Sequence, residues 1–118
     1  MANQSEDKGL LIMVTSDGMG QSDAELRHKL ITTYFKLLTE NDVLPGAICF
    51  YTEGVRLVVE GSPVIEELKD LEARGVPLIL CQTCMNYYGL TGKELVGIVG
   101  GMTDIIAAQW KADKVITI

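Results

Sequence analysis

The sequence has no long apolar stretch, no run of lysine or arginine, and few aromatic residues. Its longest apolar runs, such as residues 10–14 and 76–81, are far shorter than the ~20 residues that a membrane-spanning helix needs. The 10 basic residues are scattered and outnumbered by 16 acidic ones, for a formal net charge of -6. Because nucleic acids and anionic membranes bind clustered cations, we expect neither as a partner.

The N-terminus lacks the features of a secretory signal. Residues 1–8 are polar and include Glu6 and Asp7 before any apolar run. We therefore expect a cytoplasmic protein, in which cysteines stay reduced. A chain of 118 residues, 47% hydrophobic and 22% charged, is typical of one globular domain that folds without disulfides. We expect residues 1–118 to form that single domain.

Short apolar runs alternate with amphipathic segments along the chain. The runs 9–15, 47–51, 78–80 and 114–118 predict strands, and the segments 22–38, 62–75 and 102–111 predict helices. The glycine-rich stretch 85–101 has no lasting period and predicts mostly loop. This alternation predicts an α/β fold, with a mainly parallel sheet and helices on both faces.

The expected helices carry specific start signals and apolar faces. Ser22 and Glu25 match a capping box, and Ser62 followed by Pro63 matches an N-cap. Spacings of three and four predict that one face of the first helix points inward, formed by Leu26, Leu30, Ile31, Tyr34, Leu37 and Leu38. On the last helix, Met102, Ile105, Ile106 and Trp110 fall on one side, and Trp110 packs in the core or between subunits.

Cys81 and Cys84 directly follow the third apolar run, at the edge where parallel sheets gather their chemistry. Backbone N–H groups after a strand favour a thiolate, the nucleophilic form of cysteine. The pair does not predict a structural zinc site, because such a site needs four ligands and the chain adds only Cys49 and His28, each from a different element. We expect no metal and no cofactor. A dithiol redox pair and a persulfide carrier both stay open, and Cys49 is expected in the core.

Three segments resemble the DsrE/DsrF-like family over nearly the whole chain. They are residues 80–90, with the run Cys81-Gln82-Thr83-Cys84, residues 50–55, and residues 108–118. The likeness is to YchN-type members and to the DsrE-like half of YedF-type proteins associated with selenium metabolism. It implies a three-layer α/β/α sandwich around a sheet of about five strands, assembled as a homotrimer or hexamer.

The resemblance also implies a function, sulfur relay. Relay members carry sulfane sulfur as a persulfide on the cysteine that corresponds to Cys81. The resemblance assigns no role to Cys84. The hypothesis is a sulfurtransferase-like carrier that works with donor and acceptor proteins, with a link to selenium metabolism. Nothing marks a small-molecule pocket with its own acid and base, so a carrier fits better than a turnover enzyme. The alternatives are a dithiol redox protein and a non-catalytic assembly module.

Four further residues are candidates to line the pocket and stabilise an anion. Gln82 and Thr83 lie between the cysteines, although a cap hydroxyl at a helix start explains Thr83 better than a catalytic role does. Gly18 follows the first strand, in a partial dinucleotide motif whose third glycine position is Asp23, a carboxylate that would repel pyrophosphate. Glu53 follows the second strand. Tyr87 and Tyr88 are expected to shield the thiol or to lie at a subunit contact.

Overall fold

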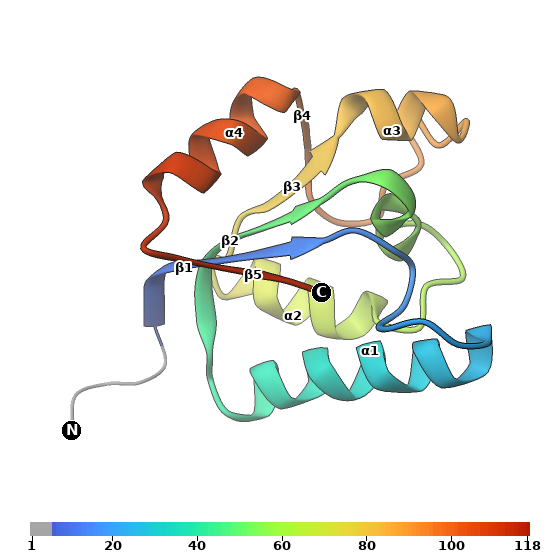
Figure 1. Ribbon diagram of the computed structural model, residues 1–118, viewed down its shortest axis with the longest axis horizontal. Helices are drawn as coiled ribbons and strands as arrows, with labels where there is room; N and C mark the ends of the chain where they lie inside the picture. The colour runs from blue at the N-terminus through green and yellow to red at the C-terminus, as the bar shows by residue number, and fades with distance from the viewer. Residues whose placement is uncertain (1–5) are drawn as a thin grey trace.

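The computed structural model describes residues 6–118 and contains one parallel sheet (Figure 1). Its five strands lie in the order β4-β3-β2-β1-β5, and every neighbouring pair is parallel. The bounds are β1 Glu6–Val14, β2 Leu44–Phe50, β3 Leu78–Cys81, β4 Ile98–Gly100 and β5 Lys114–Thr117. The predicted α/β sandwich with about five mainly parallel strands is confirmed.

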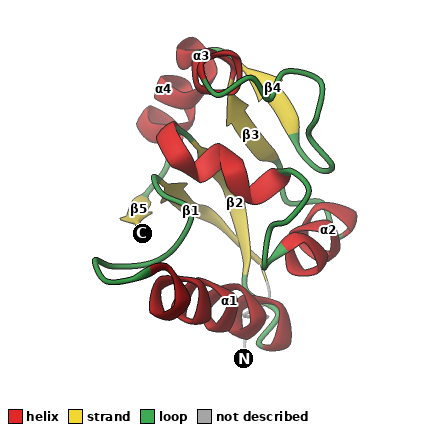
Figure 2. Cartoon of the chain, turned by 90° about the vertical axis from the view of Figure 1, so that its right-hand side faces the viewer, coloured by secondary structure: helices red, strands yellow, loops and turns green. Residues whose placement is uncertain are grey.

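Helices cover both faces of this sheet (Figure 2). The α-helices are α1 Ala24–Glu40, α2 Ile65–Ala73, α3 Gln82–Tyr87 and α4 Met102–Lys111, and a 3₁₀ helix, η1, spans Thr52–Val58. In both ribbon views α1 and α2 lie on one side of the sheet and α4 on the other. The short elements η1 and α3 lie at the carboxyl end of the strands and therefore frame whatever chemistry occurs there.

The core consists of the central strands and the helix faces that pack on them. Ile12, Ile48 and Leu80 are fully buried, which explains their continuous apolar runs in sequence. The expected inward face of α1 is partly wrong. Ile31 and Phe35 enter the core, whereas Leu26, Leu30 and Leu37 are 45–50% exposed. Phe35 fills the core position, and Leu30 and Leu37 line a surface groove with Met19 and Tyr34.

Several helix boundaries also differ from those that the sequence predicts. The N-cap of α1 is Asp23, whose carboxylate accepts from the Leu26 N–H at 3.1 Å, so the Ser22 capping box is wrong. Ser62 accepts from Val64 N–H at 3.1 Å, but the N-cap of α2 is Val64, two residues after the predicted one. The stretch 85–101 holds the second half of α3 and the edge strand β4, and η1 had no sequence signal.

Candidate thiol site

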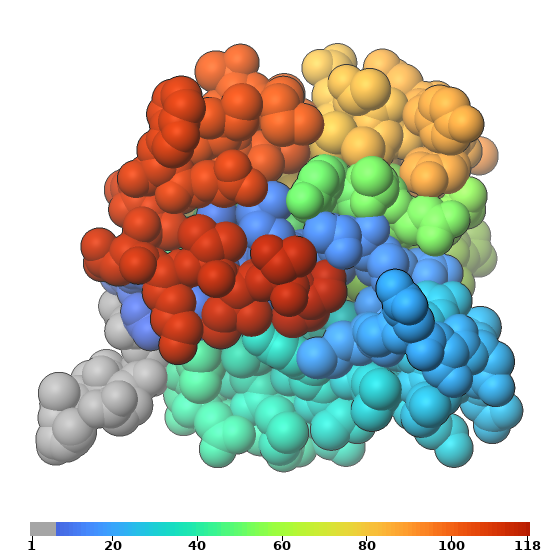
Figure 3. Space-filling model, viewed as in Figure 1, coloured from blue at the N-terminus to red at the C-terminus, as the bar shows by residue number. Residues whose placement is uncertain are grey.

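Three neighbouring strands end together at the site. Thr15 follows β1, Thr52 follows β2, and Cys81 is the last residue of β3. The Thr52 hydroxyl donates to the Thr15 carbonyl, and Tyr51 N–H donates to the Val14 carbonyl at 3.0 Å. These bonds hold the start of η1 against the end of β1. In Figure 3 the green segment of η1 fills the surface between α3 and the blue loop after β1.

Cys81 is both the end of β3 and the N-cap of α3. Its Sγ accepts from the Cys84 N–H, with a distance of 3.4 Å from sulfur to nitrogen. Cys84 also directs its Sγ at Cys81 Sγ, and the two sulfurs are 2.9 Å apart as donor and acceptor. The Cys-x-x-Cys spacing thus places both sulfurs in direct contact at the first turn of α3. Because the Cys81 thiol itself caps this turn, the reading of Thr83 as the capping hydroxyl is wrong.

Thr52 supplies a second polar contact to the pair. Its backbone N–H donates to Cys84 Sγ at 3.0 Å, across 32 residues of sequence. Thr52 has φ 49, a left-handed conformation that is uncommon for a β-branched residue and costs conformational energy. The hydroxyl bonds of Thr52 to the carbonyls of Thr15 and Tyr51 hold it in this conformation. The strained backbone therefore serves to aim an N–H group at the cysteine pair.

The two cysteines differ in exposure and in ionisation. Cys81 is 2% exposed, whereas Cys84 is half-buried. Burial raises the pKa of Cys84; its hydrogen bond to Cys81 and the charge of Cys81 raise it further, while the Thr52 N–H lowers it. Cys84 therefore keeps its proton and donates it toward Cys81. Cys49 is fully buried in β2, where burial raises its pKa to about 11, so it acts as a core residue as expected.

The four other candidate residues differ in where they lie relative to the cysteine pair. Gln82 and Thr83 are exposed on the first turn of α3, and Glu53 is exposed at the start of η1, next to Thr52. Gly18 is buried against Arg27 of α1. In Figures 1 and 2 its loop extends toward α1, with η1 between the loop and α3. Of these four residues, Glu53 belongs to η1, the second element that contacts the cysteine pair.

Aromatic and cationic side chains fix η1 to α3. The Arg56 guanidinium lies 4.4 Å from the centroid of the Tyr88 ring, a cation–π contact between the two elements. Tyr87 packs edge-on against Tyr88, with ring centroids 5.1 Å apart. Tyr88 is half-buried, but Tyr87 is 82% exposed. Sequence reasoning missed both Arg56 and Thr52; their only signal was their place in the loop after the second strand.

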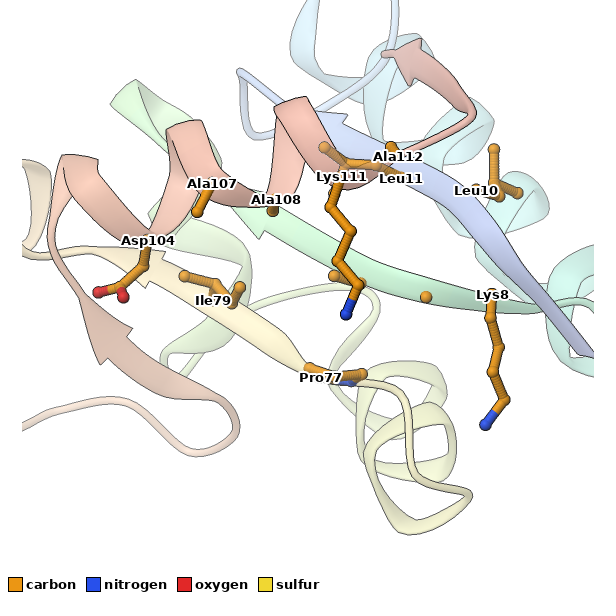
Figure 4. Close-up of a pocket in the computed structure, with 12 residues that line it drawn as sticks. Lys8, Leu10, Leu11, Pro77, Ile79, Asp104, Ala107, Ala108, Lys111 and Ala112 are labelled. Carbon is orange, nitrogen blue, oxygen red and sulfur yellow. The ribbon is translucent and has the colours of Figure 1, made fainter.

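A groove of about 320 Å³ lies elsewhere, between α4 and the sheet (Figure 4). Lys8 and Lys111 extend in the same direction at one end of it, and alanines of α4 face the strands. None of the cysteines is among its lining residues, so this groove is separate from the thiol pair. Within residues 6–118, no three His, Cys, Asp or Glu side chains cluster closely enough to hold a metal ion. No helix in the same range is long and apolar enough to cross a membrane.

Comparisons with known proteins give a consistent result. The model of the DsrE/DsrF-like family matches residues 8–118. The structure is similar to that of the YchN protein from E. coli, with a TM-score of 0.65, 19% identity, and coverage of 92% of this chain and 97% of that one. It is equally similar to MTH1491, a protein of unknown function from Methanobacterium thermoautotrophicum, with a TM-score of 0.66, 19% identity and the same coverage. None of the curated proteins matches significantly. At 19% identity these likenesses establish the fold.

Proposed function

Since the chain belongs to the DsrE/DsrF-like family, which is generally linked to sulfur relay, we propose that it carries sulfane sulfur as a cysteine persulfide. One observation carries this proposal: Cys81 and Cys84 hold their sulfurs 2.9 Å apart at the carboxyl edge of the sheet. A thiolate there attacks the outer sulfur of a donor persulfide by the displacement that governs thiol exchange. The sulfur moves to the protein, and the donor leaves as a thiolate.

Cys81 is the proposed carrier. Its Sγ accepts from both the N–H and the S–H of Cys84, so two donors stabilise negative charge on this sulfur. Its side chain is 2% exposed, which protects a persulfide from water and from other thiols. Cys84 is the half-buried member of the pair, and sulfur reaches or leaves the site on its side. Gln82, Thr83 and Glu53 frame that side with exposed polar groups.

The proposal extends to the setting in which the protein works. Sulfur donor and acceptor proteins meet it in the cytoplasm, where cysteines stay reduced between transfers. The exposed apolar side chains of β4 and α4 support self-association, as a trimer or hexamer. A link to selenium metabolism rests on family resemblance alone.

Intact-protein mass after incubation with a cysteine desulfurase and cysteine tests the proposal. We expect Cys84→Ser to gain one sulfur atom and Cys81→Ser to gain none. Cys49→Ala is the matched control, because it removes a cysteine that lies in the core and is expected to load like the parent. Equal loading of Cys81→Ser and Cys84→Ser would reject Cys81 as the carrier. No loading in any variant, with slow alkylation of both thiols, would instead favour a non-catalytic assembly module.

A dithiol redox protein is the second candidate, and the contact between the two sulfurs favours it. Its signature is reversible oxidation of Cys81 and Cys84 to a disulfide at a physiological potential, without a sulfane donor. Equilibration of the protein with glutathione buffers, followed by mass mapping of residues 81–84, measures that potential. Loading of Cys84→Ser with sulfur separates the two candidates, because a protein that acts only as a redox pair has no use for a stable persulfide.

A further inference from the structure

We propose that Cys84 discharges the persulfide on Cys81 as hydrosulfide, so that the site reduces sulfane sulfur to sulfide as well as carrying it. The proposal rests on the proposed function, since it requires a persulfide at Cys81. It starts from the position of the second thiol. The Cys84 Sγ lies 2.9 Å from the Cys81 Sγ, the atom that becomes the inner sulfur of the persulfide.

The reaction balances without any further oxidant. The Cys84 thiolate attacks Cys81 Sγ, the bond between the two cysteine sulfurs forms, and the bond from Cys81 Sγ to the outer sulfur breaks. The outer sulfur takes the electron pair of that bond and, with the proton given up by Cys84, leaves as hydrosulfide. The sulfane sulfur is reduced by two electrons, and the two cysteine sulfurs are oxidised to a disulfide. A dithiol reductant then restores both thiols.

Loading itself activates the attacking thiol. In the unloaded site, burial raises the pKa of Cys84 most, and the hydrogen bond to Cys81 and the charge of Cys81 raise it further. When Cys81 becomes a persulfide, its negative charge moves to the outer sulfur, about 2 Å farther along a sulfur–sulfur bond. The Thr52 N–H at 3.0 Å still stabilises negative charge on Cys84. The site therefore holds Cys84 protonated until sulfur arrives, and loading removes part of what raises its pKa.

Placement also favours this internal reaction over transfer to other thiols in solution. The Cys81 side chain is 2% exposed, so an external thiol has little access to its sulfur. Cys84 already touches that sulfur, and a reacting group held in place acts as if its concentration were on the order of 10⁵ M or more. The Thr52 N–H and the packing of Arg56 on Tyr88 hold η1 against the helix that carries Cys84. A persulfide on Cys81 consequently lasts only if an acceptor protein takes the outer sulfur first.

The experiment compares the fate of one loaded sulfur in three proteins under anaerobic conditions. Parent, Cys84→Ser and Cys49→Ala are mixed with one equivalent of cysteine persulfide, and protein mass and free sulfide are followed over time. For the parent and Cys49→Ala we expect one sulfide per chain and a mass lower by two hydrogen atoms, with the disulfide mapped to residues 81–84. For Cys84→Ser we expect a stable gain of one sulfur atom and sulfide release slower by roughly 100-fold.

The outcomes separate this proposal from the proposed function. If Cys84→Ser does not load, the persulfide carrier itself fails. If Cys84→Ser loads and the parent keeps its persulfide equally long, the carrier stands and the discharge by Cys84 is overturned. Cys84→Ala serves as a second variant, and circular dichroism verifies that both variants fold. Sulfide release from Cys84→Ala at the parent's rate would also overturn the proposal, because no second thiol remains beside Cys81.

Discussion

At the scale of single residues, the site is governed by which of two touching sulfurs holds a proton. Cys84 donates toward Cys81 Sγ and accepts from the Thr52 N–H. Burial, then the bond to Cys81, raises the pKa of Cys84. Cys81 thus affects the ionisation of Cys84, and removing Cys81 changes the chemistry of the thiol that remains.

Replacing Cys81 with alanine is therefore expected to lower the pKa of Cys84. The hydrogen bond and the charge of Cys81 no longer raise it, although burial, the largest cause, still does. A lower pKa means more thiolate at pH 8, so iodoacetamide should modify Cys84 faster in Cys81→Ala than in the parent. Alkylation rates at Cys84, followed by peptide mass from pH 7 to pH 10, measure this shift. Unchanged or slower modification would contradict the coupling between the two sulfurs.

The sequence predicted the cysteines of this site but not the residue that positions them. A Cys-x-x-Cys run after an apolar strand has a chemical signature that can be read directly. Thr52 contributes through its backbone N–H and its positive φ, and neither property has a sequence signature in a threonine. The place of Gly18 after the first strand predicts that it lines the pocket, because loops after neighbouring strands often meet. Its loop instead contacts Arg27 of α1. The chemistry of the side chains was thus predictable from the sequence, whereas the direction of a backbone N–H group was not.

At the scale of elements, η1 determines whether Thr52 reaches the cysteines, and Gly54 lets η1 approach the sheet. A Cβ at Gly54 would lie 2.3 Å from the Val14 carbonyl oxygen, which belongs to a central strand and cannot move aside. Gly54→Ala should lower the free energy of unfolding by about 1–3 kcal/mol, as measured by urea denaturation. In Gly101→Ala the nearest atom would lie at 4.0 Å, so we expect a loss below about 1 kcal/mol. Equal losses in both variants would disprove the close approach.

The loop after β1 is tied to α1 by an ion pair that titrates. Arg27 Nη1 lies 2.8 Å from Asp17 Oδ1, and this hydrogen bond lowers the pKa of Asp17 below 3.8. The pair therefore stabilises the fold above about pH 4, and this contribution is lost as the pH falls through the lowered pKa. Asp17→Asn should reduce stability at pH 7 by less than about 1 kcal/mol, because the pair is partly exposed.

Urea denaturation at pH 7 and at pH 3 measures the effect of Asp17→Asn. The difference in stability between parent and variant should shrink at the lower pH, since the Asp17 carboxylate of the parent is then increasingly protonated. Glu60→Gln, at an exposed position after η1, is the control with the same chemical change. A difference that grows toward pH 3 would have the wrong sign and would rule out the ion pair as its source.

Elements with a continuous apolar run or a lasting period were predictable from the sequence, and elements with neither were not. The strands near residues 9–15, 47–51 and 78–80 have continuous apolar runs because they are buried inside the sheet, and the run 114–118 forms a largely exposed edge strand. In contrast, η1, α3 and β4 have three to seven residues each, too few for a period to emerge. The face of α1 was partly misassigned because periodicity shows that a helix has an apolar stripe, but not which of two stripes enters the core.

At the scale of the whole molecule, a chain with net charge -6 exposes a set of large apolar side chains around α4. Trp110 is 84% exposed and Met102 is 50% exposed, both on α4. Ile98 of β4, the edge strand that packs beside α4, is 71% exposed. Figure 3 shows α4 in orange-red as a large part of one face of the molecule. Large exposed apolar side chains on two adjacent elements are typical of protein–protein interfaces.

Substituting lysine for Trp110 is therefore expected to break the proposed assembly. Light scattering at micromolar concentration should give a trimer or hexamer for the parent and a species near 12.9 kDa for Trp110→Lys, because the new charge would have to be buried without a partner. Ala73→Lys, an exposed change at the end of α2, adds the same charge and should assemble like the parent. Trp110 is the single tryptophan, so its fluorescence should shift to longer wavelength when dilution dissociates the parent. A parent that scatters as a monomer, with emission typical of a tryptophan in water, would leave α4 without a subunit partner and exclude self-association through this face.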